Sequence, residues 1–214
     1  MKSIASRLLL CFLSVALILG AAACSRENKD GKPHGESSKK PDISSLDPNE
    51  FISLGNYKGL SLVLEEGKSK FETVWAAVVA DSRLIIYPEG LVEYYINQAT
   101  SRYKYYAELN EITYEQVLAD FGIETADILA EARALAKEDL VSMAIIKAEG
   151  ITLSEEEKTT HFDRYAKKFV SEYGYDEDYV KENLSELVYE SMLQDKMFEF
   201  LILNNEFISQ GALE

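Results

Sequence analysis

Histidine, cysteine and proline are scarce in this chain, and each scarcity excludes a kind of chemistry or structure. The 214 residues include two histidines, His34 and His161, and two cysteines, Cys11 and Cys24. A lone histidine on a predicted helix has no catalytic partner, and no HExxH pattern or cysteine cluster provides a transition-metal site. All four prolines lie at or before Pro88, so the rest of the chain is free to form helices.

Motifs of nucleophilic and phosphate chemistry are also missing. The chain has no GxSxG turn and no glycine-rich phosphate loop. The acidic run Glu155–Glu157 directly follows Ser154, where helix capping explains it better than cation binding does. We therefore expect no catalytic residues, no cofactor and no metal, and we expect that the protein is not an enzyme.

The first 24 residues have the pattern of a bacterial export signal. Lys2 and Arg7 precede the apolar run Leu8–Leu19, and small residues then lead to Cys24. These small residues resemble the lipobox of bacterial lipoproteins, with Ala21 in place of the usual leucine. The resemblance implies acylation of Cys24 and a lipid-anchored protein of the cell envelope. An ordinary secretory signal and a retained anchor stay open, although the apolar run is short for a span of about 20 residues.

Composition then divides the chain into three parts: a signal peptide over 1–23, a polar tether over 24–41 and a folded domain over 42–214. The tether carries five basic and three acidic residues, whereas 42–214 carries 15 basic and 34 acidic ones, a formal charge of −19. Such a domain is repelled by phosphate backbones, so we expect no nucleic-acid partner.

A long helical pattern, Thr125–Gly150, is the centre of the predicted fold. Apolar residues recur along it at spacings of three and four, which is one face of a helix: Leu129, Ala132, Ala136, Leu140 and Met143. From Val141 onward the apolar stripe widens, which indicates burial on more than one side. We expect one sizeable helical domain or two small lobes around this helix.

Helix start signals divide the rest of the body. Ser69 with Glu72 and Ser154 with Glu157 form capping-box patterns, and further N-caps are expected at Thr113 and Asp176. The last helical region is expected to break near Asn183. Leu60–Leu64 is the one convincing extended stretch. The sequence therefore predicts an elongated all-α protein with at most one short β-type segment, near residues 60–64.

The order of several segments resembles bacterial trigger factor, the ribosome-associated folding chaperone, over about residues 53–203. The matching segments are Leu54–Leu60, Val74–Val79, Ile86–Val92, Thr113–Leu118, Ala136–Ile151 and Ser154–Glu157. The resemblance implies the C-terminal helical domain of that family, a body with two helical arms that form an open cradle for unfolded chains. The chaperone parts of parvulin-type periplasmic foldases have a similar architecture.

Departures from the family pattern limit what the resemblance implies. No GFRxGKxP-type ribosome-docking loop is present, so ribosome binding is not expected. The FKBP-like isomerase domain of the family would lie where this chain has only Ser61–Thr73. Thirteen residues are too few for such a domain, so isomerase activity is not expected either.

Tyrosine and methionine are the candidate contacts with clients, because both offer adaptable apolar surface. The predicted helix over 89–109 is rich in tyrosine, and one of its faces carries Tyr95, Ala99, Arg102 and Tyr106. A tyrosine stripe is more often packing than a binding site. The candidate residues for client binding are Tyr94, Tyr95, Tyr103, Tyr106, Met143, Met192 and Met197.

These observations predict a membrane-anchored, extracytoplasmic chaperone that holds unfolded or newly exported polypeptides without ATP. Its partners would be such polypeptides and the membrane, which it meets through the N-terminal lipid; whether it forms a homodimer stays open. One alternative is a structural or adaptor lipoprotein that binds a single dedicated envelope partner. A second is a foldase associated with prolyl isomerisation.

Overall fold

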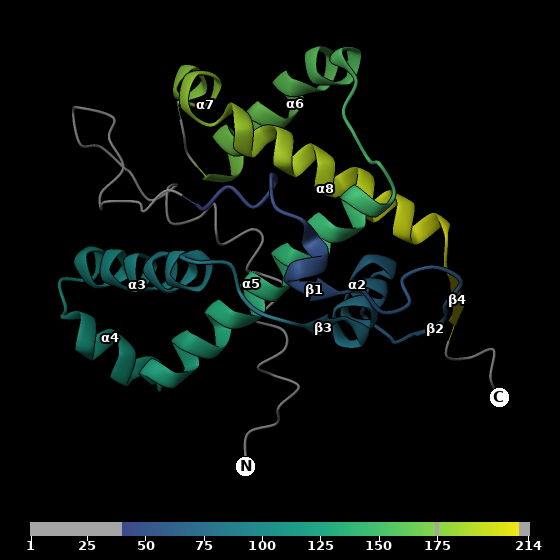
Figure 1. Ribbon diagram of the computed structural model, residues 1–214. Helices are drawn as coiled ribbons and strands as arrows, with labels where there is room; N and C mark the ends of the chain where they lie inside the picture. The colour runs from purple at the N-terminus through teal and green to yellow at the C-terminus, as the bar shows by residue number, and fades with distance from the viewer. Residues whose placement is uncertain (1–39, 174–175, 210–214) are drawn as a thin grey trace. The chain divides into compact units, whose positions relative to one another are not determined.

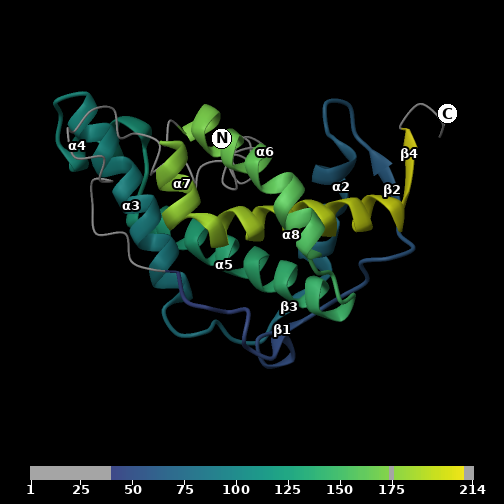
Figure 2. The ribbon, with the colours of Figure 1, turned by 90° about the horizontal axis from the view of Figure 1, so that it is seen from above.

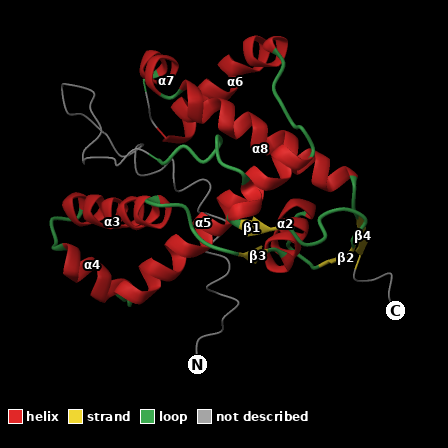
Figure 3. Ribbon diagram, viewed as in Figure 1, coloured by secondary structure: helices red, strands yellow, loops and turns green. Residues whose placement is uncertain are grey.

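The computed structural model describes residues 40–173 and 176–209. Of the described residues, 65% are helical and 7% lie in strands, and Figure 3 shows these strands as short arrows among the helices. The prediction of an all-α protein is confirmed. The predicted signal peptide, Cys24 and nearly all of the tether lie outside the described residues.

The elements of the described chain follow one another with short connections (Figure 1). After the 3₁₀ helix η1 (Pro48–Glu50), the helices are α2 (Lys70–Asp81), α3 (Leu91–Leu109), α4 (Tyr114–Phe121), α5 (Thr125–Ala148), α6 (Glu155–Tyr173), α7 (Glu177–Asn183) and α8 (Ser185–Leu203). The strands are β1 (Ile52–Ser53), β2 (Ser61–Leu64), β3 (Arg83–Leu84) and β4 (Glu206–Ser209).

Local capping chemistry sets the helix boundaries as the sequence predicts. Ser69 and Glu72 form a complete capping box at the start of α2. The Thr113 hydroxyl accepts a hydrogen bond from the backbone N–H of Gln116 at 3.1 Å, and Asp176 caps α7 in the same way. Gly122, with φ +63°, ends α4 in the left-handed conformation that glycine adopts without strain.

The chain forms two compact units, each assembled from separate stretches of sequence. Among the described residues, unit 1 consists of 40–41, 89–136, 159–173 and 176–188, and unit 2 of 42–88, 137–158 and 189–209. Both α5 and α8 therefore contribute residues to each unit.

Unit 1 contains α3, α4, the first half of α5, most of α6, α7 and the start of α8. Its buried side chains come from every one of these helices: Leu91, Tyr95, Ala99, Val117, Ala132, Ala166, Val180 and Val188. Helices α3 and α4 pack against each other. The Lys181 ammonium of α7 lies 3.9 Å from the Asp163 carboxylate of α6.

Unit 2 is built around the second half of α5, where the six consecutive residues 140–145 are all buried. This confirms the prediction that the helix is covered on more than one side. On α8, the ring of Phe198 lies edge-on to Phe71 and to Trp75 of α2, with centroids 4.1 and 5.4 Å away. An aromatic cluster thus joins α2 to α8.

Two pairs of short strands complete unit 2. Strand β1 pairs antiparallel with β3, and β2 pairs in parallel with β4. Only β2 lies in the one extended stretch that the sequence predicts; β1, β3 and β4 go beyond that prediction. Residues 61–73, where the family would place an isomerase domain, form β2, a turn and the first residues of α2.

Asn205 holds the parallel pair at its start. Its side-chain oxygen accepts the backbone N–H of Leu60 at 2.8 Å, while its amide nitrogen donates to the carbonyls of Tyr57 and Leu201 at 3.0 and 2.7 Å. One side chain thus satisfies three backbone groups from three parts of the chain, which fixes where α8 ends and where β2 begins.

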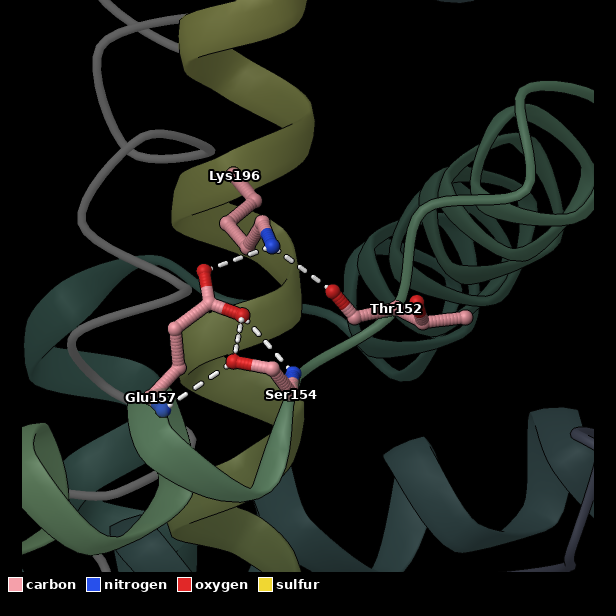
Figure 4. Close-up of polar contacts among 4 residues, drawn as sticks. All are labelled: Thr152, Ser154, Glu157 and Lys196. Carbon is pink, nitrogen blue, oxygen red and sulfur yellow. Dashed lines mark hydrogen bonds and ion pairs between the residues drawn. The ribbon is translucent and has the colours of Figure 1, made fainter.

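A second polar joint fixes the start of α6 (Figure 4). The Glu157 carboxylate accepts the backbone N–H of Ser154 at 2.7 Å in the predicted capping box, and it also accepts the Lys196 ammonium of α8 at 2.7 Å. Lys196 donates in addition to the carbonyl of Thr152. The hydrogen bond from Lys196 is the largest cause, and those from Ser154 the next, of a pKa of Glu157 lowered to about 2.

Replacing Asn205 by alanine tests the importance of its three contacts. Asn205→Ala leaves the Leu60 N–H and two carbonyls without their partner, so we expect the free energy of unfolding to fall by about 2 kcal/mol. Asn204→Ala is the matched control, because that side chain is exposed and makes one bond, to the Phe200 carbonyl. Urea unfolding measures both variants; equal losses would contradict the account.

Candidate functional site

Three large apolar side chains are exposed at the corner where α3 meets α4. The exposed fractions are 42% for Tyr106, 61% for Leu109 and 56% for Phe121. Together they form what we call the α3–α4 patch. Single exposed apolar residues are ordinary, but three on one helical corner are a candidate binding surface.

The corner that carries the patch is held in a fixed conformation. The ring of Tyr106 meets that of Phe121 edge-on, with centroids 5.3 Å apart. In the turn, the Asn110 side chain donates to the Tyr106 carbonyl at 2.8 Å and the Ile112 N–H donates to the Ala107 carbonyl at 3.0 Å. Such a preorganised surface loses little conformational entropy when it binds a partner.

An ion pair holds α3 to the first half of α5 behind this corner. The guanidinium of Arg102 donates to the Glu131 carboxylate at 2.9 Å, and both side chains are about three-quarters covered. Burial lowers the pKa of Arg102, but the hydrogen bonds and charges of Glu131 and Tyr103 together outweigh burial and raise the pKa overall. Removing one partner would leave a partly buried charge unpaired.

Acidic residues dominate the exposed charge of the segment that carries the patch. Between residues 104 and 124 the exposed charged side chains are Lys104 and five carboxylates, Glu108, Glu111, Glu115, Asp120 and Glu124. A surface of this kind disfavours anionic partners and tolerates neutral or basic ones.

The structure distributes the predicted client-binding residues between core and surface. Tyr94, Tyr95, Met143, Met192 and Met197 are buried; their side chains pack in the core. Tyr103 is half-buried beside Arg102, whose guanidinium lies 5.1 Å from its ring centre. Tyr106 alone belongs to the α3–α4 patch. Client contact at any of these positions stays a prediction.

Leu109 and Phe121 join the patch although sequence reasoning did not single them out. Both are the last residues of their helices. A large apolar side chain at a helix end, directly before a turn, has few neighbours from its own element to cover it. That position is a signal that the sequence contains, and a search confined to tyrosine and methionine misses it.

One carboxyl group in unit 2 has an unusual electrostatic environment. Glu138 of α5 accepts the indole N–H of Trp75 at 3.3 Å. Burial raises the pKa of Glu138 to about 7; the charge of Asp139 acts in the same direction and the Trp75 hydrogen bond in the opposite one. A carboxyl with this pKa is a candidate functional group, although such shifts also arise in groups whose role is structural.

Within residues 40–173 and 176–209, no group of three or more histidine, cysteine, aspartate or glutamate side chains is arranged to hold a metal ion. No helix in the same part of the chain is long and apolar enough to cross a membrane.

Comparison with models of known protein families identifies the family of the chain that carries the α3–α4 patch. The family model of the bacterial trigger factor protein C-terminus matches residues 69–203, well over half of the chain. The chain belongs to the trigger factor C-terminal family. A search of curated proteins finds no match.

Membership in the trigger factor C-terminal family confirms the resemblance drawn from the segment order. The trigger factor C-terminal domain is a chaperone module, and the family binds unfolded polypeptides. The match runs from Ser69 to Leu203 and so includes α3, α4 and the whole α3–α4 patch.

The raised pKa of Glu138 makes stability depend on pH. In the unfolded chain this carboxyl ionises near its ordinary pKa of 4.5, whereas in the fold it ionises near 7. The contribution of protonated Glu138 to the free energy of unfolding is therefore fully present below about pH 4.5. It is lost as the pH rises through 7, which lowers the free energy of unfolding by up to about 3 kcal/mol. We expect Glu138→Gln to abolish this loss.

Urea unfolding between pH 5 and pH 8, followed by the fluorescence of the single tryptophan, measures this dependence. Glu199→Gln on an exposed position of α8 is the control and should keep the slope of the wild type. If the free energy of unfolding changed equally with pH in Glu138→Gln and in the wild type, a group other than Glu138 would be responsible for the pH dependence.

Proposed function

We propose that this protein is a membrane-anchored, extracytoplasmic chaperone that holds unfolded or newly exported polypeptides without ATP. The observation that carries the proposal is the α3–α4 patch, an exposed apolar corner within a domain whose family binds unfolded polypeptides. Binding would use weak apolar contacts, which suit many client sequences because they require no particular hydrogen-bonding pattern.

The surroundings of the patch support an unfolded chain as its partner. Tyr106 and Phe121 present rings that pack against aliphatic or aromatic side chains. The five exposed carboxylates between residues 104 and 124 keep this corner soluble while it carries uncovered apolar surface. The same negative charge opposes binding of nucleic acid, in agreement with the formal charge of −19 over residues 42–214.

The N-terminal sequence supports the membrane-anchored part of the proposal. The basic start, the apolar run and the small residues before Cys24 resemble a lipoprotein signal. Acylation of Cys24 would attach the protein to the outer face of the membrane, and the polar residues up to Pro41 would connect the lipid to the folded part. This address suits clients that have just been exported.

Substitutions in the patch test the chaperone proposal. We expect the double variant Leu109→Ser, Phe121→Ser to suppress aggregation of several unrelated unfolded proteins about tenfold less effectively than the wild type, because apolar contact area is lost. Light scattering at near-stoichiometric ratios, with the full-length chain in lipid nanodiscs, gives the measurement.

The matched control is Ile85→Ser, Ile86→Ser, which removes two equally exposed apolar side chains from unit 2. This variant should keep the activity of the wild type. Loss of activity in both double variants would indicate nonspecific hydrophobic adsorption of clients rather than binding at the patch. If the wild type protected no client, the holdase proposal would be refuted in favour of an adaptor.

Replacement of Cys24 by alanine tests the anchor. In cells fed an alkyne-labelled fatty acid, we expect the wild type to become labelled and Cys24→Ala to stay unlabelled. The variant should also lose the membrane attachment that the lipid provides. Mass spectrometry of the mature N-terminus identifies the modified residue. An unlabelled wild type would exclude acylation and leave a secretory signal or a retained anchor.

A further inference from the structure

The parallel pair β2–β4 in unit 2 is an unusually small sheet. Its four residue pairs run from Ser61 with Glu206 to Leu64 with Ser209. Parallel sheets are normally covered on both faces, and an isolated pair of strands is marginally stable. Figure 2 shows β4 beside β2, on the side away from α2. This sheet therefore has the form of an element that a further strand would complete.

Its two faces differ in how well they are covered. Leu62 and Phe207 are paired in register and half-buried, and the Lys70 ammonium of α2 lies 5.3 Å from the ring centre of Phe207. Side chains alternate along a strand, so the next pair, Val63 and Ile208, belongs to the opposite face. Val63 is 42% exposed, which leaves apolar surface on that face.

The outer edge of β4 presents backbone groups to a further strand. The Glu206 N–H donates to the Leu60 carbonyl at 2.8 Å, so Glu206 and, two residues on, Ile208 direct their backbone groups toward β2. Phe207 and Ser209 direct theirs to the other side. Within the described part of the chain, β4 pairs with β2 alone, and no hydrogen bond to the N–H of Phe207 or Ser209 is recorded.

The edge has no proline, lysine or bulge against strand addition, and its single charge is Glu206 at the start of this four-residue strand. Natural edge strands carry proline, lysine or a bulge to block pairing. Residues 206–209 read Glu-Phe-Ile-Ser and pair with β2 without a bulge. Nearby, Leu203 at the end of α8 is 82% exposed. An open edge beside exposed apolar side chains is what an extended, partly apolar peptide requires.

We propose that the outer edge of β4 binds an extended segment of an unfolded polypeptide as a third strand. Main-chain hydrogen bonds give affinity independent of sequence, and the surface around Val63 and Ile208 takes alternate apolar side chains. The inference rests on the proposed function for its class of partner and adds a site of different chemistry from the α3–α4 patch. The formal charge of −19 over residues 42–214 disfavours a second copy of this chain as the occupant.

Proline at position 209 tests the edge. Ser209→Pro removes the outward N–H and leaves the bonds from β4 to β2 in place, since proline is tolerated where the N–H of an edge strand faces away from the sheet. Ser209→Ala is the matched control, because it changes the same exposed side chain and keeps the N–H.

The probe is a fluorescein-labelled peptide of nine residues that alternates valine and threonine between terminal lysines. A second peptide has the same sequence with the backbone amide of every valine and threonine N-methylated, so that neither of its edges can donate hydrogen bonds. Binding is measured by fluorescence anisotropy with the full-length chain in lipid nanodiscs. The first peptide should bind the wild type and Ser209→Ala equally, and should bind Ser209→Pro about five- to tenfold more weakly. The methylated peptide should bind none of the three.

Hydrogen exchange on the wild type gives a readout that does not depend on how the variants fold. The first peptide should slow exchange at the Phe207 and Ser209 amides, and the methylated peptide should not. Equal affinities of Ser209→Pro and Ser209→Ala, or unchanged exchange at both amides, would overturn the inference. Aggregation assays report separately on the proposed function, so a failed holdase and a closed edge are distinguishable.

Discussion

Helix α5 is the element on which the rest of the structure depends. Two glutamates of α5 and one directly after it accept hydrogen bonds from three other segments. Glu131 accepts from the Arg102 guanidinium of α3, and Glu138 accepts from the Trp75 indole of α2. Glu149, the first residue after α5, accepts from the Tyr57 hydroxyl and the Lys58 ammonium of the loop before β2. Between Glu138 and Glu149, residues 140–145 are buried on all sides. A 24-residue helix supplies both the apolar core and the polar attachments.

These attachments differ in their chemistry because their surroundings differ. The Lys58 and Tyr57 hydrogen bonds lower the pKa of Glu149, whereas burial raises the pKa of Glu138. The Lys58 side chain stays 46% exposed, so solvent screens its charge and limits what the ion pair with Glu149 contributes to stability. A largely buried carboxyl with one indole donor costs stability once it ionises. Two glutamates eleven residues apart, Glu138 and Glu149, therefore have pKa values shifted in opposite directions.

Helix boundaries could be predicted from the sequence because capping is local. Ser69 with Glu72, Thr113 with Gln116, and Ser154 with Glu157 lie three residues apart, and each pair is confirmed. Strand β4 could not be predicted in this way, since its partner β2 lies more than 140 residues earlier and its register is fixed by Asn205. The unusual environment of Glu138 likewise requires Trp75, 63 residues away.

Part of the candidate site was within reach of sequence reasoning and part was not. Tyr106 belongs to the tyrosine-rich helix that the composition emphasises, and the fold leaves it exposed. Tyr94 and Tyr95 belong to the same run but pack in the core, because they fall on the part of α3 that the rest of unit 1 covers. Burial depends on tertiary packing, which the spacing of aromatic residues along one helix does not determine.

The trigger factor C-terminal family binds unfolded polypeptides, and we propose the α3–α4 patch and the edge of β4 as the surfaces that contact them here. The measurement that tests this most directly is methyl NMR of the full-length protein in nanodiscs with one disulfide-bonded client. The client is added in two forms, either reduced and unfolded or oxidised and folded. The account predicts that the Leu109 methyl signals shift with the unfolded client alone, while those of buried Leu140 do not. Shifts caused by the folded client, or none at Leu109 with either form, would contradict it.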